Sequence, residues 1–201
     1  MSAKLVVLGA GGHAKVVIAT AQALGYEVIG AYDDGSRAGQ SVLGIPILGN
    51  TAEAVASNYP AVLGIGSNRV RHKLSSELSC EWICLVHPAA VVHESVVLGA
   101  GTVIFAGVVV QPETVIGDHV ILNTGSSVDH DCQLGNAVHV GPGARLCGGV
   151  SVGEGSLLGV GSAVIPGVNI GSWCSVGAGA AVIRDCGDGK TVVGIPAQER
   201  R

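Results

Sequence analysis

Aromatic residues and charged residues are both scarce in this chain of 201 residues. Phe, Trp and Tyr make up 3% of it, and Asp, Glu, Lys and Arg make up 13%, with a net charge of −4. Without a basic patch or a run of like charge, the sequence excludes the electrostatic surface of a nucleic-acid-binding or membrane-surface protein. Hydrophobic residues still account for 48% of the chain, so the core must be built from aliphatic side chains.

Targeting and cross-linking signals are absent as well. No apolar run approaches the ~20 residues of a membrane span, and the first ten residues read as a strand rather than a signal peptide. The six cysteines have neither the C-x-x-C spacing of a metal or redox site nor the density of a disulfide scaffold. We therefore expect free thiols, no metal and a cytoplasmic location.

Residues 1–87 alternate short apolar runs with helical stretches, which is typical of a small α/β domain of Rossmann-like type with a mostly parallel sheet. The expected strands are 4–9, 27–32, 45–48 and 61–65, and the expected helices are 14–24, 51–57 and 68–79.

Residues 88–201 follow a different rule, a period of six. Stepping by six from Val92 to Val182 meets sixteen aliphatic residues without an insertion, and a small or β-branched residue usually lies two positions before each. Residues two apart in a strand face the same side, so each hexad buries two side chains and then turns a corner. Three sides close a coil of eighteen residues, which predicts stacked parallel coils instead of a β-sandwich with irregular loops.

A glycine-rich segment opens the first predicted helix. Gly9-x-Gly11-x-x-Ala14 follows a strand, and the acidic pair Asp33 and Asp34 lies about twenty residues further on, which formally meets the dinucleotide fingerprint. Fewer than ninety residues precede the repeats, too few for two nucleotide-binding halves, so we reject a dehydrogenase. Such a loop still brings the backbone close to a phosphate at a helix N-terminus; the alternative is a tight turn followed by a solvated acidic loop.

The uninterrupted hexads resemble those of the hexapeptide-repeat acyltransferases, which implies a left-handed β-helix. The segments 7–15, 32–34, 64–71 and 128–132 resemble the bacterial nucleotide-sugar N-acetyltransferases. Those enzymes transfer acetyl from acetyl-CoA to the 4-amino group of a 4-amino-4,6-dideoxy sugar on UDP or a related nucleotide. Open alternatives are a GDP- or dTDP-linked amino sugar, O-acetylation of sialic acid, and a non-catalytic sensor of sugar nucleotides.

The resemblance implies a role for each matching residue. The substrate-binding set comprises Gly11, Gly12 and His13 near the diphosphate, Asp33 and Asp34 near the uridine, Gly66 and Asn68 on the opposite rim, and Asn123 on the β-helix. The acetyl-CoA set comprises His139 near the acetyl group, Gly148 facing the thioester oxygen, and Gly194 and Pro196 in a tail that closes over the coenzyme. The base is His130 with Asp131 as its helper, where the family usually has Glu.

The register of the hexads supports a cluster of these polar residues. His139 points outward, His130 and Asp131 lie at a corner, and His130 lies one coil beneath Gly148, so we expect them with Asn123 in one outer patch. Imidazole titrates near neutrality, which suits a base for acetyl transfer to an amine, and Asp131 would stabilise the imidazolium. A metal site formed by this Asp-His-Asp segment and His139 is the weaker alternative, because further convergent ligands are missing.

The outward places of the first coils are also aliphatic, at Val97, Val103, Val109, Val115 and Ile121. An exposed apolar patch of this size is rare on a monomer. We therefore expect a homotrimer, with active sites between neighbouring β-helices as the resemblance also implies.

Overall fold

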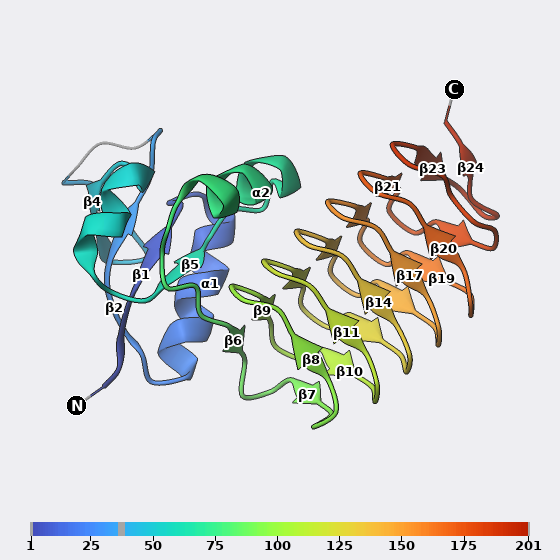
Figure 1. The fold of residues 1–201 in the computed structure, drawn as a ribbon, viewed down its shortest axis with the longest axis horizontal. Coiled ribbons are helices and arrows are strands. Elements are labelled where there is room, and N and C mark those ends of the chain that lie inside the picture. Colours follow the sequence, from blue (N-terminus) through green and yellow to red (C-terminus); the bar gives the residue numbers. More distant parts are fainter. Residues whose placement is uncertain (1, 36–38, 201) are drawn as a thin grey trace.

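The computed structural model describes residues 2–35 and 39–200, and it consists of a small α/β domain followed by a long β-helix (Figure 1). The sheet of the first domain has the strand order β3-β4-β2-β1-β5, with β3 antiparallel to β4 and the other pairs parallel. Its strands are β1 (Lys4–Leu8), β2 (Glu27–Tyr32), β3 (Ser41–Val42), β4 (Ile45–Gly49) and β5 (Ala61–Leu63). The mostly parallel sheet is confirmed, and only the short β3 was not predicted.

Within the described residues, two α-helices and one 3₁₀-helix accompany this sheet. They are α1 (Gly12–Ala23), η1 (Thr51–Ser57) and α2 (Asn68–Glu77). Apolar residues of α1, such as Val17 and Ile18, are fully buried against one face of the sheet. Neither α-helix of the described residues is long and apolar enough to cross a membrane.

The remaining chain forms a left-handed parallel β-helix with three faces, each named here after one of its strands. The β15 face contains β6 (Leu85–Val86), β9 (Val103–Ile104), β12 (Ile121–Leu122), β15 (His139–Val140), β18 (Leu157–Leu158), β21 (Ser175–Val176), β23 (Thr191–Val193) and β24 (Gln198–Glu199). The β13 face contains β7 (Val91–Val92), β10 (Val109–Val110), β13 (Ser127–Val128), β16 (Arg145–Leu146), β19 (Ala163–Val164) and β22 (Ala181–Val182). The β14 face contains β8 (Val97–Leu98), β11 (Val115–Ile116), β14 (Gln133–Leu134), β17 (Ser151–Val152) and β20 (Asn169–Ile170).

The register confirms the predicted coil of eighteen residues. Ser127 pairs with Val109 below and Arg145 above, and the corresponding parallel pairs recur on each face. The inward aliphatic residues form one continuous core that runs through the coils. The ladder already starts at β6, where Leu85 pairs with Val103, so the predicted domain boundary at residue 88 lies one strand inside it.

The α/β domain covers the first coils of the β15 face. Val103 and Ile121 are buried there in the same apolar cluster as α1, so their predicted exposure was wrong. Val97 is 58% exposed and Val115 is 47% exposed, as predicted, whereas Val109 is half-buried. A period of six identifies which residues point outward but does not reveal which of them another domain covers.

Helix α2 lies along the edge between the β14 and β15 faces, called here the β14–β15 edge. The corner residues of four successive coils contact this helix at steps of eighteen: His119, Ala137, Gly155 and Trp173. Among these contacts, the guanidinium of Arg69 lies 4.8 Å from the ring centroid of Trp173. Polar and aromatic contacts thus attach the α/β domain to the coils that carry the predicted site.

Candidate active site

A cavity of about 440 Å³ lies at the carboxyl ends of β1, β2 and β5. Ligands of open parallel sheets bind at this edge, where the loops that follow neighbouring strands converge. The lining residues are Gly9, Gly11, Gly12, His13, Asp33, Asp34, Gly35, Thr51, Gly64, Ile65, Gly66, Val70 and Leu74. Six of the seven substrate residues predicted in this domain therefore lie together; Asn68 is the exception.

The start of α1 provides a place for an anion. Gly11 is the N-cap residue, and no side chain caps the helix. The first backbone N–H groups are therefore available to a phosphate, and the helix dipole favours a negative charge there. The glycine that the backbone itself requires is Gly9, whose φ is +111° and whose added Cβ would lie 2.9 Å from the Gly64 carbonyl oxygen.

The two carboxylates of the acidic pair hold the cavity loops in place. Asp33 accepts hydrogen bonds from the backbone N–H of Ala10 at 2.8 Å and of Gly35 at 2.9 Å. Asp34 accepts hydrogen bonds from the backbone N–H and the hydroxyl of Thr51, each at 2.8 Å. A carboxylate has about four acceptor positions, so both groups retain capacity for a ligand after ordering the loops.

Asn68 instead contacts the β-helix. Its side-chain amide donates to the carbonyl oxygens of Gly155 at 2.9 Å and Ser156 at 3.1 Å, and its own oxygen accepts from Arg71. These contacts use the amide to attach α2, and the residue does not line the cavity.

Two histidines lie close together where the α/β domain covers the β15 face. The ring centroids of His13 and His139 lie 6.0 Å apart. Burial, and secondly the charge of Arg71, lowers the pKa of each histidine to about 4. Both rings are therefore neutral at physiological pH, and within the described residues Nε2 of His13 is buried without a hydrogen-bond partner.

The hydrogen bonds of Asn123 determine which nitrogen of His139 carries the proton. The Asn123 side-chain oxygen accepts from the backbone N–H of Thr124 at 2.9 Å, so its NH₂ group faces Nε2 of His139 at 3.0 Å. Nε2 then accepts, and Nδ1 carries the hydrogen and serves the backbone hydrogen bond to Gly66. His139 thereby connects the coil to the rim of the cavity.

His130 lies on the edge between the β13 and β14 faces, called here the β13–β14 edge. Its Nδ1 lies 2.6 Å from the Asp131 carboxylate, and the two side chains are 60% and 64% exposed. The hydrogen bond to Asp131, followed by the charge of Asp129, raises the pKa of His130 above its usual 6.5. The interaction at Nδ1 leaves Nε2 to face a substrate.

Gly148 lies directly above His130. A Cβ added to Gly148 would lie 2.6 Å from both Cε1 and Nε2 of the imidazole ring. The backbone keeps the stacking in register, because the N–H of Gly149 donates to the His130 carbonyl at 2.9 Å. Within the hydrogen bonds of the described residues, the N–H of Gly148 has no acceptor, so it is available to an oxyanion.

The expectation of one outer patch was wrong for a single chain. Asn123 and His139 lie at the β15 face beneath the α/β domain, whereas His130, Asp131 and Gly148 lie on the opposite edge of the triangular coil. His130 and His139 are nine residues apart, which is half of an eighteen-residue coil, so they lie across the coil from each other.

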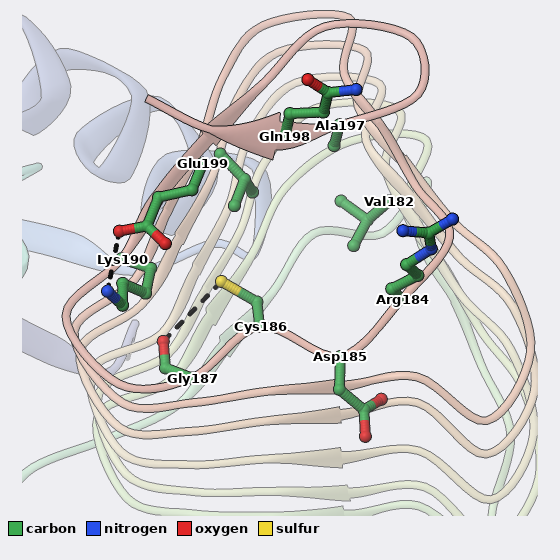
Figure 2. Close-up of a pocket in the computed structure, with 10 residues that line it drawn as sticks. Val182, Arg184, Asp185, Cys186, Gly187, Lys190, Ala197, Gln198 and Glu199 are labelled. Atoms are coloured by element: carbon green, nitrogen blue, oxygen red, sulfur yellow. Dashed lines mark hydrogen bonds and ion pairs between the residues drawn. The ribbon is translucent and has the colours of Figure 1, made fainter. Parts of the chain in front are cut away.

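The chain ends in a tail that closes the last coil (Figure 2). Strand β24 runs antiparallel to β23, and Lys190 and Glu199 form an ion pair at 2.7 Å. A cavity of about 320 Å³ between the last coil and the tail is lined by Val182, Arg184, Asp185, Cys186, Gly187, Lys190, Val192, Ala197, Gln198 and Glu199. Gly194 and Pro196 lie in the β23–β24 connection and do not line it.

A cavity at the carboxyl edge of a parallel sheet, joined to hexad coils that carry an exposed His-Asp pair, defines a two-domain hexapeptide-repeat transferase. Two family models match the chain: the PglD N-terminal domain over residues 4–78 and the bacterial transferase hexapeptide (six repeats) over residues 113–148.

Solved structures extend the likeness to the whole chain. PerB from Caulobacter crescentus, solved with CoA and GDP-perosamine, is 42% identical, with a TM-score of 0.93 over 98% of this chain and 97% of that one. The acetyltransferase domain of PglB from Neisseria gonorrhoeae, solved with acetyl coenzyme A, is 38% identical, with a TM-score of 0.93 over 100% of both chains. WeeI from Acinetobacter baumannii is 25% identical, with a TM-score of 0.87 over 99% and 100%.

A shorter match is uncharacterized protein L142 of Acanthamoeba polyphaga mimivirus, 34% identical over 97 residues; the chain spans 20% of that protein's length. On the full-length matches, this chain belongs to the hexapeptide-repeat nucleotide-sugar N-acetyltransferases, so it is an acetyltransferase.

Proposed function

We propose that the protein transfers the acetyl group of acetyl-CoA to the 4-amino group of a UDP-linked 4-amino-4,6-dideoxy sugar, with His130 as general base. The observation that carries this proposal is the 2.6 Å contact between Nδ1 of His130 and Asp131 on an exposed edge. A base held by a carboxylate, with its second nitrogen free, is the group that amine acylation requires.

The sugar nucleotide would bind in the cavity of residues 1–87. The uncapped N-terminus of α1, with Gly11, Gly12 and His13, would hold the diphosphate. Asp33 and Asp34 would accept hydrogen bonds from the ribose or the base, and Gly66 would form the opposite rim.

Acetyl transfer would take place on the β-helix that follows the α/β domain. The amine nitrogen attacks the thioester carbonyl while Nε2 of His130 takes up its proton, and Asp131 stabilises the resulting imidazolium. The free N–H of Gly148 would donate to the oxyanion. When the intermediate collapses, the C–S bond breaks, the thiolate of CoA leaves and accepts a proton, and the amide product remains.

The site would be completed between copies of the chain, because the cavity and His130 lie on opposite sides of one β-helix. Val91, Val97 and Val115, which are 64%, 58% and 47% exposed, flank the β13–β14 edge below His130. An apolar surface next to the base supports a homotrimer in which a neighbour brings its cavity to this edge. Sedimentation should show the trimer at micromolar concentration, and a stable monomer of 20.0 kDa would refute it.

The tail and the thiols support two further assignments. Ile195, between Gly194 and Pro196, is 81% exposed, which supports a tail that covers the acyl carrier or a neighbouring chain. All six cysteines are free thiols, which supports a reducing cytoplasm.

A GDP-linked amino sugar is the second candidate, favoured by the 42% identity to a protein solved with GDP-perosamine. The deciding experiment measures thiol release from acetyl-CoA with UDP-, GDP- and dTDP-linked 4-amino sugars and with sialic acid. Release with one nucleotide-linked amine supports N-acetylation and identifies the nucleotide. Release with sialic acid alone would establish O-acetylation, and no release with any acceptor would favour a non-catalytic sensor.

A further inference from the structure

Arg71 of α2 is a fully buried cation whose hydrogen-bond acceptors are all uncharged. The residue is 1% exposed, and its guanidinium donates to five backbone carbonyls and to the side-chain oxygen of Asn68. A buried charge without a counter-ion is costly, so such a group persists only where its full set of donors is used. Burial lowers the pKa of Arg71, yet a guanidinium remains protonated at neutral pH.

The acceptors of Arg71 belong to two separate parts of the molecule. Two of them, the carbonyls of Ile65 at 3.1 Å and Gly66 at 3.3 Å, form the rim of the nucleotide cavity. Three further acceptors are backbone carbonyls of the β-helix. Among them are the carbonyl of Ala137 at 2.7 Å and the carbonyl of Val138, the residue that precedes His139, at 3.4 Å. One rigid planar group therefore fixes the distance between the cavity rim and the strand that carries His139.

We propose that Arg71 is a positioning residue that holds the Gly66 rim and the His139 strand in register, so that nucleotide binding and the orientation of His139 depend on one guanidinium. Gly66 is the shared element, because its carbonyl accepts from Arg71 and its backbone also bonds His139. The part concerning nucleotide binding rests on the proposed function; the part concerning His139 does not.

The charge of Arg71 has a second effect on the same histidine. The titratable groups facing His139 are His13 from α1 and Arg71 from α2, and the other groups in contact, Asn123 and Gly66, are uncharged. After burial, Arg71 is the largest influence that lowers the pKa of His139. The guanidinium thereby disfavours the protonated ring and helps to keep His139 neutral, while Asn123 determines which nitrogen carries the hydrogen.

Two substitutions separate the hydrogen-bonding fork of Arg71 from its charge. Arg71→Lys keeps a cation and removes the planar fork, whereas Arg71→Met removes the charge and retains a long apolar stem. Arg69→Lys is the matched control, since Arg69 is exposed on the same helix and lies against Trp173. The readouts are the NMR titration of the His139 ring, and KM and kcat with the sugar nucleotide that the wild type uses.

We expect Arg71→Lys to raise KM for the sugar nucleotide by about tenfold or more, with a smaller change in kcat, and to leave His139 neutral at pH 6. Arg71→Met should move the His139 titration upward by about one pH unit. Arg69→Lys should change neither quantity. An unchanged KM in Arg71→Lys, or an unchanged titration in a folded Arg71→Met, would overturn the proposal; if Arg71→Met does not fold, Arg71→Lys decides alone.

The titration also distinguishes this proposal from the proposed function. If the wild type acetylates no nucleotide-linked amine, the proposed function fails, yet the His139 ring still reports whether Arg71 acts on it. Conversely, an active enzyme whose Arg71→Met variant titrates like the wild type would refute the role of Arg71 alone.

Discussion

Replacement of Gly148 by alanine should test the proposed base, His130, without replacing that residue itself. The added Cβ would lie 2.6 Å from Cε1 and Nε2 of His130, whereas ordinary van der Waals contact begins near 3.4 Å. The φ of Gly148 is outside the left-handed region, so the backbone accepts alanine without strain, and the imidazole must move by about 1 Å. A displacement of this size at a reacting group costs about 10² in rate.

We therefore expect Gly148→Ala to lower kcat about 100-fold while KM for both substrates changes little. The His130 side chain is 60% exposed and can rotate into solvent, so the free energy of unfolding should change by less than about 1 kcal/mol. Alanine also retains the backbone N–H, so an oxyanion contact at this position would survive.

Steady-state kinetics and thermal unfolding of purified Gly148→Ala provide the measurement. Gly187→Ala is the matched control, because Gly187 has no atom within 4 Å of an added Cβ and its φ is also outside the left-handed region. A Gly148→Ala enzyme with kcat within about threefold of wild type would refute the reasoning. Either the ring of His130 would not occupy this position during catalysis, or His130 would not be the base.

Three further outcomes follow from the same structure. His130→Ala should lower kcat by about 10²–10⁴ with little change in KM. It should also abolish the rise of the rate with pH, which in the wild type lies above pH 6.5 because Asp131 raises the pKa of His130. Asp131→Asn should move that rise to lower pH. Asp33→Ala should raise KM for the sugar nucleotide and leave that for acetyl-CoA unchanged, since its carboxylate orders the cavity loops at Ala10 and Gly35. Three histidines (13, 119 and 139) have pKa values lowered to about 4, so the unfolded chain binds more protons than the folded chain below pH 6.5. The free energy of unfolding should therefore fall as the pH is lowered from 6.5 to 4. In urea titrations, His119→Asn should reduce the slope of the free energy of unfolding against pH by up to about 1.4 kcal/mol per pH unit.

The coils were predictable because their determinants are local. Each hexad supplies two inward residues and a corner, and each strand pairs with the strand eighteen residues away. An error of one residue would turn the buried side chains outward, so an unbroken aliphatic period determines the register along the β-helix. For the same reason the stacking of Gly148 above His130 could be predicted from numbering alone.

The docking of the α/β domain could not be predicted in this way. It covers Val103 and Ile121, whose sequence positions are equivalent to those of the exposed Val97 and Val115. Helix α2 likewise turns Asn68 towards the coils and buries Arg71, although both residues belong to the motif that suggested a substrate rim. Contacts between domains depend on the surfaces of both partners, and a repeat period describes only one of them.

The two histidines of the β-helix illustrate how placement, rather than residue type, selects the proton acceptor. Burial beneath the α/β domain, and secondly the charge of Arg71, lowers the pKa of His139 to about 4, whereas the hydrogen bond to Asp131 on the opposite edge raises the pKa of His130 above 6.5. A base that must take a proton from an amine near neutral pH needs a conjugate acid that holds the proton. His130 meets that requirement and His139 does not, so the electrostatics favour the exposed edge for chemistry and leave the buried ring to connect the coil to the nucleotide cavity.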